Sequence, residues 1–314
     1  MTLPMFPVLP QDHPLTMRAH LDVFPDEVAE LDAMDREARV RELVTLAHEL
    51  VTFAEQELSG GKQIVARVAL FSGGNDSTVL THIMRPALTH AAHANTTIGI
   101  EATRQFVRDT CAAWDLPLLE RHAPVTYAEL VTEQGFPGPG HHFKMYQRLK
   151  ERALRDVRRE LVTDRSQRVV FLAGRRRHES ARRANIPEME REGSVIWVSP
   201  LVLWTALDMN TYRDMHPDVP RNEVSDLIHM SGECLCGAFA TEGELDEIAV
   251  WFPDVAAEIR DLERQVRAAG HPEPRCRWGW GATSPERPSQ VGQLCSSCDA
   301  RQAVLFDNNQ GENV

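Results

Sequence analysis

The chain has 314 residues, 42% of them hydrophobic and 25% charged, with a formal net charge of −12 at pH 7. This is the composition of an ordinary globular protein with one large or two modest domains, and the negative charge argues against a surface built as a whole for a polyanion. No apolar run of about 18 residues occurs, so we expect no membrane span. The N-terminus lacks the pattern of a signal peptide, so we expect a cytoplasmic location, where thiols stay reduced.

The first two thirds of the chain alternate between helical and strand-like patterns. Apolar residues at helical spacing predict a helix over 25–57, which the Ser-Gly-Gly sequence at 59–61 ends. The apolar, β-branched run at 64–71 is typical of a buried parallel strand. Further strands are predicted at 96–100, 117–122, 168–174 and 194–201, and helices at 77–88, 101–114 and 144–161. This alternation predicts an α/β fold with a doubly wound, mostly parallel sheet.

Charge and cysteine content vary along the chain. Residues 1–60 hold 12 acids and 4 bases, whereas residues 144–183 hold 14 bases and 5 acids. The basic segment is compatible with DNA, tRNA or a nucleotide, although some of its arginines also fit the exposed face of a helix. Cysteines, glycines and tryptophans gather after residue 222. We therefore expect an N-terminal helical region at 1–60, an α/β domain at 61–230, and a cysteine-rich region at 231–314 with a helix at 244–269 and a disordered tail.

The sequence SGGNDS follows the first clear strand and opens the next helix. Gly73 and Gly74 permit backbone conformations that other residues resist, and their amides can approach an anion closely. The helix that begins near Ser77 adds its positive N-terminal end, and the hydroxyl of Ser72 is a further donor. Asp76 fits beside a phosphate where a Mg²⁺ ion bridges them, or where the carboxylate contacts another part of a nucleotide. The turn therefore predicts a phosphate-binding loop, although not a Walker loop, because no lysine follows the glycines.

The pattern SGGxDS after a strand resembles the PP-loop of ATP pyrophosphatases. The match is complete at Ser72, Gly73, Gly74, Asp76 and Ser77. In that family the loop grips the pyrophosphate end of ATP, and the enzyme cleaves ATP between its α- and β-phosphates. The resemblance implies a Rossmann-like fold of the adenine nucleotide alpha hydrolase type, ATP and Mg²⁺ as ligands, and catalytic roles for Asp76 and Ser77.

Two later segments resemble the sulfonucleotide reductase branch of this superfamily. The first, GRRRHESARR, matches its second signature at Gly174, Arg176, Arg177, Ser180 and Arg183. Guanidinium forks after a strand suit a second phosphate grip, and the resemblance implies nucleotide binding at these positions and catalytic roles for Arg176 and Arg177. The second segment matches at Pro200, Leu201, Trp204, Thr205, Asp208, Tyr212 and Pro220. Thr103 also matches, although Ala102 replaces an expected acid, and the resemblance covers roughly residues 64–240.

The branches differ in their chemistry. Reductases that make sulfite use a cysteine in a Glu-Cys-Gly-x-His tail, and this sequence contains no such motif. The chain looks more like the ATP pyrophosphatases of DNA phosphorothioation systems, in which ATP adenylates an oxygen and sulfur from a donor persulfide then replaces it. The resemblance implies a cysteine desulfurase as partner and a nucleic acid, with DNA favoured, as acceptor. The alternatives are a sulfonucleotide reductase, a tRNA thiolase and a non-catalytic zinc-containing nucleotide-binding module; the oligomeric state stays open.

Cysteine spacing suggests a metal site. Cys111 falls on the apolar side of a predicted helix and is expected in the core. Four thiolates fit tetrahedral zinc or a [4Fe–4S] cluster equally well, but the family resemblance and the nearby Trp278 and Trp280 favour the cluster. The expected ligands are Cys234, Cys236, Cys295 and Cys298. Cys276 is either an alternative ligand in place of Cys236 or a sulfur-handling thiol.

Overall fold

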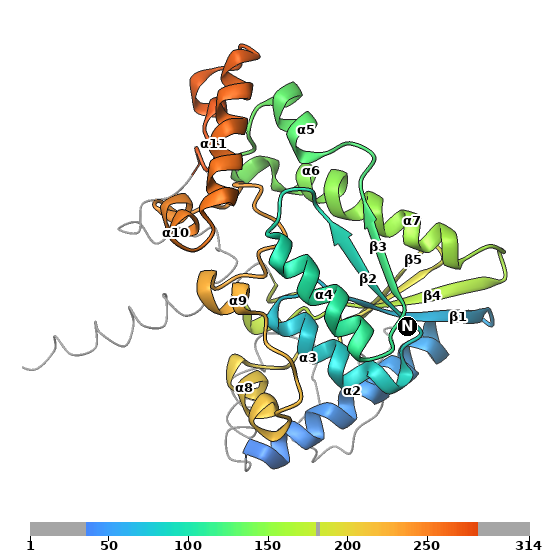
Figure 1. Cartoon of the computed structure of the whole chain (residues 1–314). Helices are drawn as coiled ribbons and strands as arrows, with labels where there is room; N and C mark the ends of the chain where they lie inside the picture. Colours follow the sequence, from blue (N-terminus) through green and yellow to red (C-terminus); the bar gives the residue numbers. More distant parts are fainter. Residues whose placement is uncertain (1–35, 180–182, 282–314) are drawn as a thin grey trace, which may run out of the picture.

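The computed structural model describes residues 36–179 and 183–281, and a single sheet forms its centre (Figure 1). The strands are β1 (Gln63–Leu70), β2 (His90–Asn95), β3 (Leu118–His122), β4 (Gln167–Leu172), β5 (Met189–Glu192) and β6 (Val195–Val198). They lie in the order β3-β2-β1-β4-β6-β5. All neighbours run parallel except β5, which is antiparallel to β6. The predicted α/β fold with a mostly parallel sheet is therefore confirmed.

Helices connect and cover these strands. They are α2 (Arg36–Leu58), α3 (Asn75–Met84), α4 (Glu101–Ala113), α5 (Tyr127–Gln134), α6 (His142–Tyr146), α7 (Arg152–Leu161), α8 (Ala206–Met215), α9 (Glu223–Ile228), α10 (Glu244–Trp251) and α11 (Pro253–Ala268). A π-helical turn, Gln147–Glu151, joins α6 to α7, so the helix predicted over 144–161 is one helical segment with an irregular turn. None of the described helices is long and apolar enough to cross a membrane.

Two sequence predictions need correction. The strand predicted at 96–100 is wrong, because β2 is His90–Asn95 and the later residues form the loop after it. β2 has the sequence HAAHAN, which lacks the β-branched residues that mark strands, so the pattern favoured its neighbour. The helix predicted over 244–269 is two helices that meet at Phe252, because Pro253 has no N–H with which to continue α10 and instead starts α11. The expected tail, and residues 25–35 of the first expected helix, lie outside the described residues.

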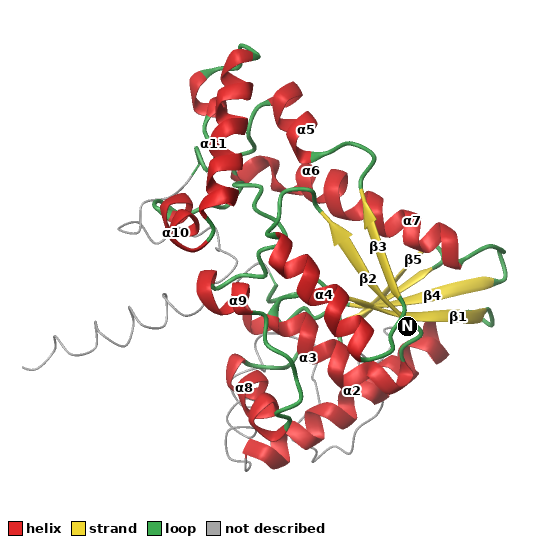
Figure 2. Ribbon diagram, viewed as in Figure 1, coloured by secondary structure: helices red, strands yellow, loops and turns green. Residues whose placement is uncertain are grey.

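The two faces of the sheet are covered by different helices (Figure 2). Side chains of α2 and α3 pack with Val170 and Leu172 of β4, whereas side chains of α7 pack with Val169 and Phe171. Successive residues of a strand point to opposite faces, so these two clusters lie on opposite sides of the sheet. A third cluster joins α5, α9, α10 and α11 to the cysteine segment around residue 235.

The strand order fixes where a ligand can bind. From β1 the chain proceeds to β2 and β3 on one side, and from β4 to β6 on the other. The order reverses between β1 and β4, and the crevice outside the carboxyl ends of two such strands is where open α/β sheets bind ligands. The loops that follow β1 and β4 both open at this point.

A buried ion pair ties α2 to α8. Arg39 and Asp208 lie 2.8 Å apart, and each side chain is only 6% exposed. Asp208 also accepts hydrogen bonds from the backbone and hydroxyl of Thr205, which form the capping box of α8. Thr205 and Asp208 belong to the second family-like segment, so these two matches have a structural role here.

Replacing Asp208 with alanine should therefore destabilise the protein by about 3–5 kcal/mol, because the buried guanidinium of Arg39 loses the Asp208 carboxylate and α8 loses its capping side chain. Asp261→Ala is the matched control: it removes a carboxylate from an exposed pair with Arg264 and should cost about 0–1 kcal/mol. Urea unfolding followed by circular dichroism measures both values. Similar costs for the two variants would contradict a stabilising role for the buried pair.

Candidate nucleotide-binding site

The loop after β1 has the geometry of an anion cradle. Gly73 has a φ of +76°, and Gly74 is the N-cap of α3 without a side-chain cap. The first-turn amides of α3 therefore keep their donors available for a ligand. A Cβ at position 73 would lie 2.8 Å from the side chain of Thr103, so only glycine fits there. The loop thus combines a left-handed turn, free amides and a helix N-terminus.

Hydroxyl groups close the loop from inside. The Oγ atoms of Ser72 and Ser77 are 3.1 Å apart, and Ser77 donates to the carbonyl of Gly74 at 2.9 Å. Thr78 donates to the same carbonyl. Of the five PP-loop residues predicted from the sequence, Ser72, Gly74 and Ser77 are therefore hydrogen-bonded to one another within the turn. Its shape is set before any ligand binds, which lowers the entropic cost of binding.

Residues far along the chain hold this turn from outside. Asn222 donates to the carbonyl of Gly73 at 2.9 Å and to the hydroxyl of Thr103 at 3.2 Å. Thr103 in turn donates to the carbonyl of Ser231 at 2.7 Å. Thr103 matched the family pattern in the sequence, whereas Asn222 did not stand out. Its only local signal is its place as the N-cap of α9, which does not reveal its distant partner.

The loop after β4 meets the loop after β1. A Cβ on Gly174 would lie 3.0 Å from the backbone of Asp76, so the two loops are in close contact only because residue 174 is glycine. Arg176 donates from Nε to the carboxylate of Asp76 at 2.8 Å. Both side chains are largely buried, at 12% and 21% exposed. The structure thus brings together the predicted residues Gly174, Arg176 and Asp76.

Arg177 and Arg183, also predicted from this second motif, pair with groups other than Asp76. Arg177 donates to the carbonyl of Ile186 at 2.9 Å and pairs with Glu188. Arg183 pairs with Glu179, and Ser180 lies outside the described residues. Burial raises the pKa of Glu179 against the opposing charge of Arg183, and the nearby carboxylate of Asp76 adds to the rise. The nucleotide contacts of Arg177, Ser180 and Arg183 stay predictions.

Sequence reasoning missed one cation of this site. Arg213 of α8 interacts electrostatically with Asp76, and burial lowers its pKa. Its Nη1 donates to the carbonyl of Pro220 at 3.1 Å, whereas its buried Nε has no hydrogen-bond partner in the described part of the chain. Arg213 therefore adds a second positive charge to the surroundings of Asp76. The residue lies in the family-like segment TYRDM, which was its only signal.

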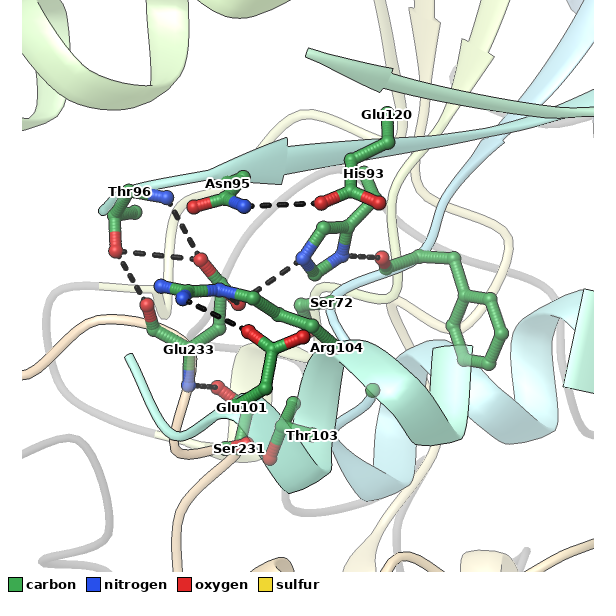
Figure 3. Close-up of polar contacts among 12 residues, drawn as sticks. Ser72, His93, Asn95, Thr96, Glu101, Thr103, Arg104, Glu120, Ser231 and Glu233 are labelled. Atoms are coloured by element: carbon green, nitrogen blue, oxygen red, sulfur yellow. Dashed lines mark hydrogen bonds and ion pairs between the residues drawn. The ribbon is translucent and has the colours of Figure 1, made fainter. Parts of the chain in front are cut away.

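A buried polar cluster links the loop to the cysteine segment (Figure 3). His93 of β2 donates from Nδ1 to the carbonyl of Phe71 at 2.8 Å, and its Nε2 lies 3.0 Å from Glu233. Glu233 also accepts from the backbone of Thr96 at 2.7 Å and lies 3.4 Å from Arg104. Burial alone would raise the pKa of Glu233, but the hydrogen bond from His93 and the two positive charges hold that pKa below its ordinary value.

The described cysteines differ in environment. Cys111 is buried in the core as predicted, and burial raises its pKa to about 12. Cys234 and Cys236 are hydrogen-bonded to each other, which lowers the pKa of Cys234 and raises that of Cys236. Cys276 is fully buried, and its Sγ donates to the carbonyl of His271 at 3.1 Å. Trp278 packs in the same apolar cluster as Cys236 and Cys276.

Only part of the metal site predicted from the cysteines lies within the described residues. Cys295 and Cys298 lie outside the described residues. Among residues 36–179 and 183–281, no group of three or more histidine, cysteine, aspartate or glutamate side chains is placed to hold a metal ion. Cys234 and Cys236 would supply two thiolates of a four-thiolate site, so the choice between iron–sulfur cluster and zinc stays a prediction.

The sequence was compared with known families and proteins. Residues 66–227 match the family described as the phosphoadenosine phosphosulfate reductase domain. No curated protein sequence matches the chain.

Three solved structures illustrate the range of similar folds. The phosphoadenylyl-sulfate reductase of Candida auris, in a phosphate complex, is 17% identical with a TM-score of 0.42, covering 62% of this chain and 93% of its own. The FMN adenylyltransferase of Candida glabrata is 10% identical with a TM-score of 0.38, covering 64% of each chain. The U34-tRNA thiolase of Methanococcus maripaludis, with its [4Fe-4S] cluster, is 14% identical with a TM-score of 0.35. The match covers 81% of this chain and 89% of the thiolase. These similarities are too low to indicate a substrate.

Gly73 offers a direct test of the cradle. Gly73→Ala should weaken ATP binding about tenfold or more, because the new methyl group meets Thr103 and displaces the loop. Gly61→Ala is the matched control, since Gly61 has a similar φ of +73° and nothing within 4 Å of an added Cβ. It should cost about 1–2 kcal/mol of stability and leave ATP affinity unchanged. Calorimetric titration with ATP that shows equal affinities for the two variants would contradict this role.

Proposed function

Because the chain belongs to the phosphoadenosine phosphosulfate reductase domain family, we propose that it is a PP-loop ATP pyrophosphatase. It cleaves ATP to AMP and pyrophosphate and adenylates an acceptor oxygen for sulfur insertion. The observation that carries the proposal is the contact between the two motifs at the reversal point of the sheet. There Gly174 and Arg176 meet Asp76 of the SGGNDS turn.

The site suits charge development on a leaving pyrophosphate. The acceptor oxygen attacks the α-phosphorus, the bond from that phosphorus to the bridging oxygen breaks, and pyrophosphate departs with the bonding electrons. The loop amides and the N-terminus of α3 receive its negative charge. Arg176 and Arg213 add positive charge at the mouth of the loop, where each charge-assisted contact to phosphate would contribute about 1.5–3 kcal/mol. Asp76 would hold Mg²⁺, which neutralises the phosphates when bound.

A nucleic acid is the acceptor that fits the surroundings best. Phe143 and Tyr146 of α6 are 66% and 39% exposed, so both rings are accessible to a ligand. Tyr146 lies near enough to Arg175 and Lys150 for their charges to affect its hydroxyl. Exposed rings among cations suit stacking on bases and contact with phosphates. We propose a DNA backbone phosphate as the oxygen that is activated, with tRNA as the alternative.

Sulfur must come from outside the chain in this proposal. A separate cysteine desulfurase would deliver it as a persulfide, docking near the cysteine-rich end. The terminal sulfur of the persulfide attacks the adenylated phosphorus, the bond to the oxygen that carries AMP breaks, and AMP leaves with that oxygen. A second thiol then attacks the desulfurase cysteine sulfur of the resulting P–S–S–Cys link. The S–S bond breaks, a disulfide forms between the two thiols, and the sulfur stays on the acceptor phosphorus. The cluster formed with Cys295 and Cys298 would tie the C-terminal segment to Cys234 and Cys236, which would contribute to folding.

A sulfonucleotide reductase is the second candidate, and the family match itself favours it. The two activities share the loop but differ in substrate and product. The pyrophosphatase releases pyrophosphate from ATP, whereas the reductase releases sulfite from phosphoadenosine phosphosulfate. Assays with the two substrates separate the candidates directly.

Asp76→Ala should abolish the formation of AMP and pyrophosphate from ATP while leaving the fold intact, because its side chain lies at the mouth of the loop and not in the apolar core. Product formation is followed by chromatography, and folding by circular dichroism. Asp218→Ala is the control, since it removes an exposed carboxylate that pairs with His82 away from the loop. Full activity in Asp76→Ala, or sulfite production by the wild type without pyrophosphate release, would refute the pyrophosphatase.

The same variant tests the acceptor. Mass spectrometry of DNA and tRNA from host cells should detect phosphorothioate linkages in DNA with the wild-type chain and none with Asp76→Ala. Thiolated tRNA bases that depend on Asp76 would instead identify tRNA as the acceptor. Sulfur in neither nucleic acid would reject a nucleic-acid acceptor.

Protein purified under anaerobic conditions should contain about four irons per chain. Cys295→Ser and Cys298→Ser should lose the iron, because each removes a thiolate ligand. Cys276→Ser should keep it, since the Cys276 thiol is already hydrogen-bonded to backbone within the core. Cys111→Ser is the control for loss of a buried thiol elsewhere. Loss of iron from Cys276→Ser would make Cys276 a ligand, and one zinc without iron would reject the cluster.

A further inference from the structure

A second polar pocket lies at the opposite edge of the sheet from the nucleotide loop. It has a volume of about 600 Å³. Most of its lining residues precede β1, β4 or β6 and so lie at the amino ends of these parallel strands, while α7, β4 and β5 contribute one arginine each. The pocket is lined by Lys62, Arg158, Val162, Thr163, Asp164, Arg165, Arg168, Arg191, Gly193 and Ser194. Since β4 spans six residues at about 3.3 Å each, roughly 20 Å of sheet separate it from the loop.

The pocket concentrates positive charge on an acidic protein. Five of its lining residues are lysine or arginine and one is acidic, whereas the whole chain carries −12. Arg158, Arg165 and Arg191 form no ion pair with a carboxylate within the described ranges. Cations left without partners around one cavity are arranged for an anion, because their mutual repulsion is relieved only when negative charge binds.

Buried groups fix the floor of this pocket. Arg168 is 6% exposed, and its guanidinium donates to the carbonyls of Ser59 and Gly193. Burial lowers the pKa of Arg168, and the charge of Arg191 lowers it further. The Oγ of Ser194 is also buried, and it has no hydrogen-bond partner among the described residues. A rigid cation and a hydroxyl donor without a partner are both features of an oxyanion site.

A basic helical segment connects this pocket with the nucleotide edge. The segment runs from α6, which carries the exposed rings of Phe143 and Tyr146, to α7, which carries Arg158 of the pocket lining. Figure 1 shows α6 leading into α7 alongside the sheet. Its residues 142–161 span about 30 Å at 1.5 Å each. Arg155 and Arg159 are 60% and 71% exposed along it. A chain of phosphates could therefore contact both ends of the segment, which a single small anion could not do.

We propose that this pocket binds phosphate groups of a nucleic-acid backbone, at a site separate from the nucleotide loop. The unpartnered arginines contact phosphate oxygens, and the helical segment guides the strand toward the other edge of the sheet. The inference concerns binding alone, so it stands or falls independently of whether the loop cleaves ATP.

The test measures binding of a fluorescent 20-base-pair DNA duplex to the full chain by anisotropy, without ATP, across a range of salt concentrations. Arg158→Gln combined with Arg191→Gln should weaken binding about tenfold or more at low salt and reduce the salt slope by about two. Arg260→Gln combined with Arg264→Gln removes the same charge from exposed ion pairs on α11 and should change affinity less than about twofold.

Two further measurements decide between the outcomes. Arg158→Lys with Arg191→Lys preserves charge and should retain the salt slope, while circular dichroism verifies the fold of every variant. Equal loss of duplex binding in the Arg158/Arg191 and Arg260/Arg264 glutamine variants, or no loss in either, would overturn the proposal that this pocket binds phosphate. If the Arg158/Arg191 glutamine variant loses tripolyphosphate binding but keeps its affinity for the duplex, the ligand is a free polyphosphate. That result would overturn the proposal of a nucleic-acid ligand.

Discussion

The close approach of two loops at the reversal point of the sheet is the constraint on which the candidate site depends. Gly174 lies against the backbone of Asp76, where a Cβ would approach to 3.0 Å and push the two loops apart, and Arg176 reaches the Asp76 carboxylate beside this contact. The contact exists because β1 and β4 are neighbours although about 100 residues separate them. Each loop alone would bind anions without selectivity. Together the two loops place the Asp76 carboxylate and the Arg176 guanidinium at the opening of one site.

The charges at this mouth are nearly balanced before any ligand arrives. Asp76 pairs with Arg176 and Glu179 pairs with Arg183, and Arg213 adds a further positive charge that acts on Asp76. Burial makes each unpaired charge costly. A polyphosphate with Mg²⁺ brings both signs of charge and can exchange partners with these groups. Beneath the mouth, His93 and Glu233 connect the strand end to the cysteine segment, so the loop and Cys234 share one rigid support. The geometry is therefore fixed by buried polar contacts as much as by apolar packing.

The sequence predicted correctly those elements that depend on residues close together in the chain. The turn at 72–77, α4 and the strand around Phe171 follow from glycines, periodicity and β-branched runs within a few residues. Strand β2 was not predicted because its alanines and histidines have low strand propensity. They suit close packing and the contact of His93 with Phe71 instead. Asn222 and Arg213 escaped because their partners lie more than 100 residues away, and no single sequence reveals such pairings.

The two edges of the sheet also show why an average charge misleads. A net charge of −12 argues against a polyanion partner only if the charge is spread evenly. In the folded chain, arginines at the carboxyl edge are paired with Asp76 and Glu179. At the amino edge, α7, the turn before β4 and strand β5 bring Arg158, Arg165 and Arg191 around one pocket. Electrostatic attraction decays over about 8–10 Å at physiological salt, so a ligand at that pocket experiences its own cations and not the distant acids. Local folding thus reverses, at one edge, the conclusion that composition alone supports.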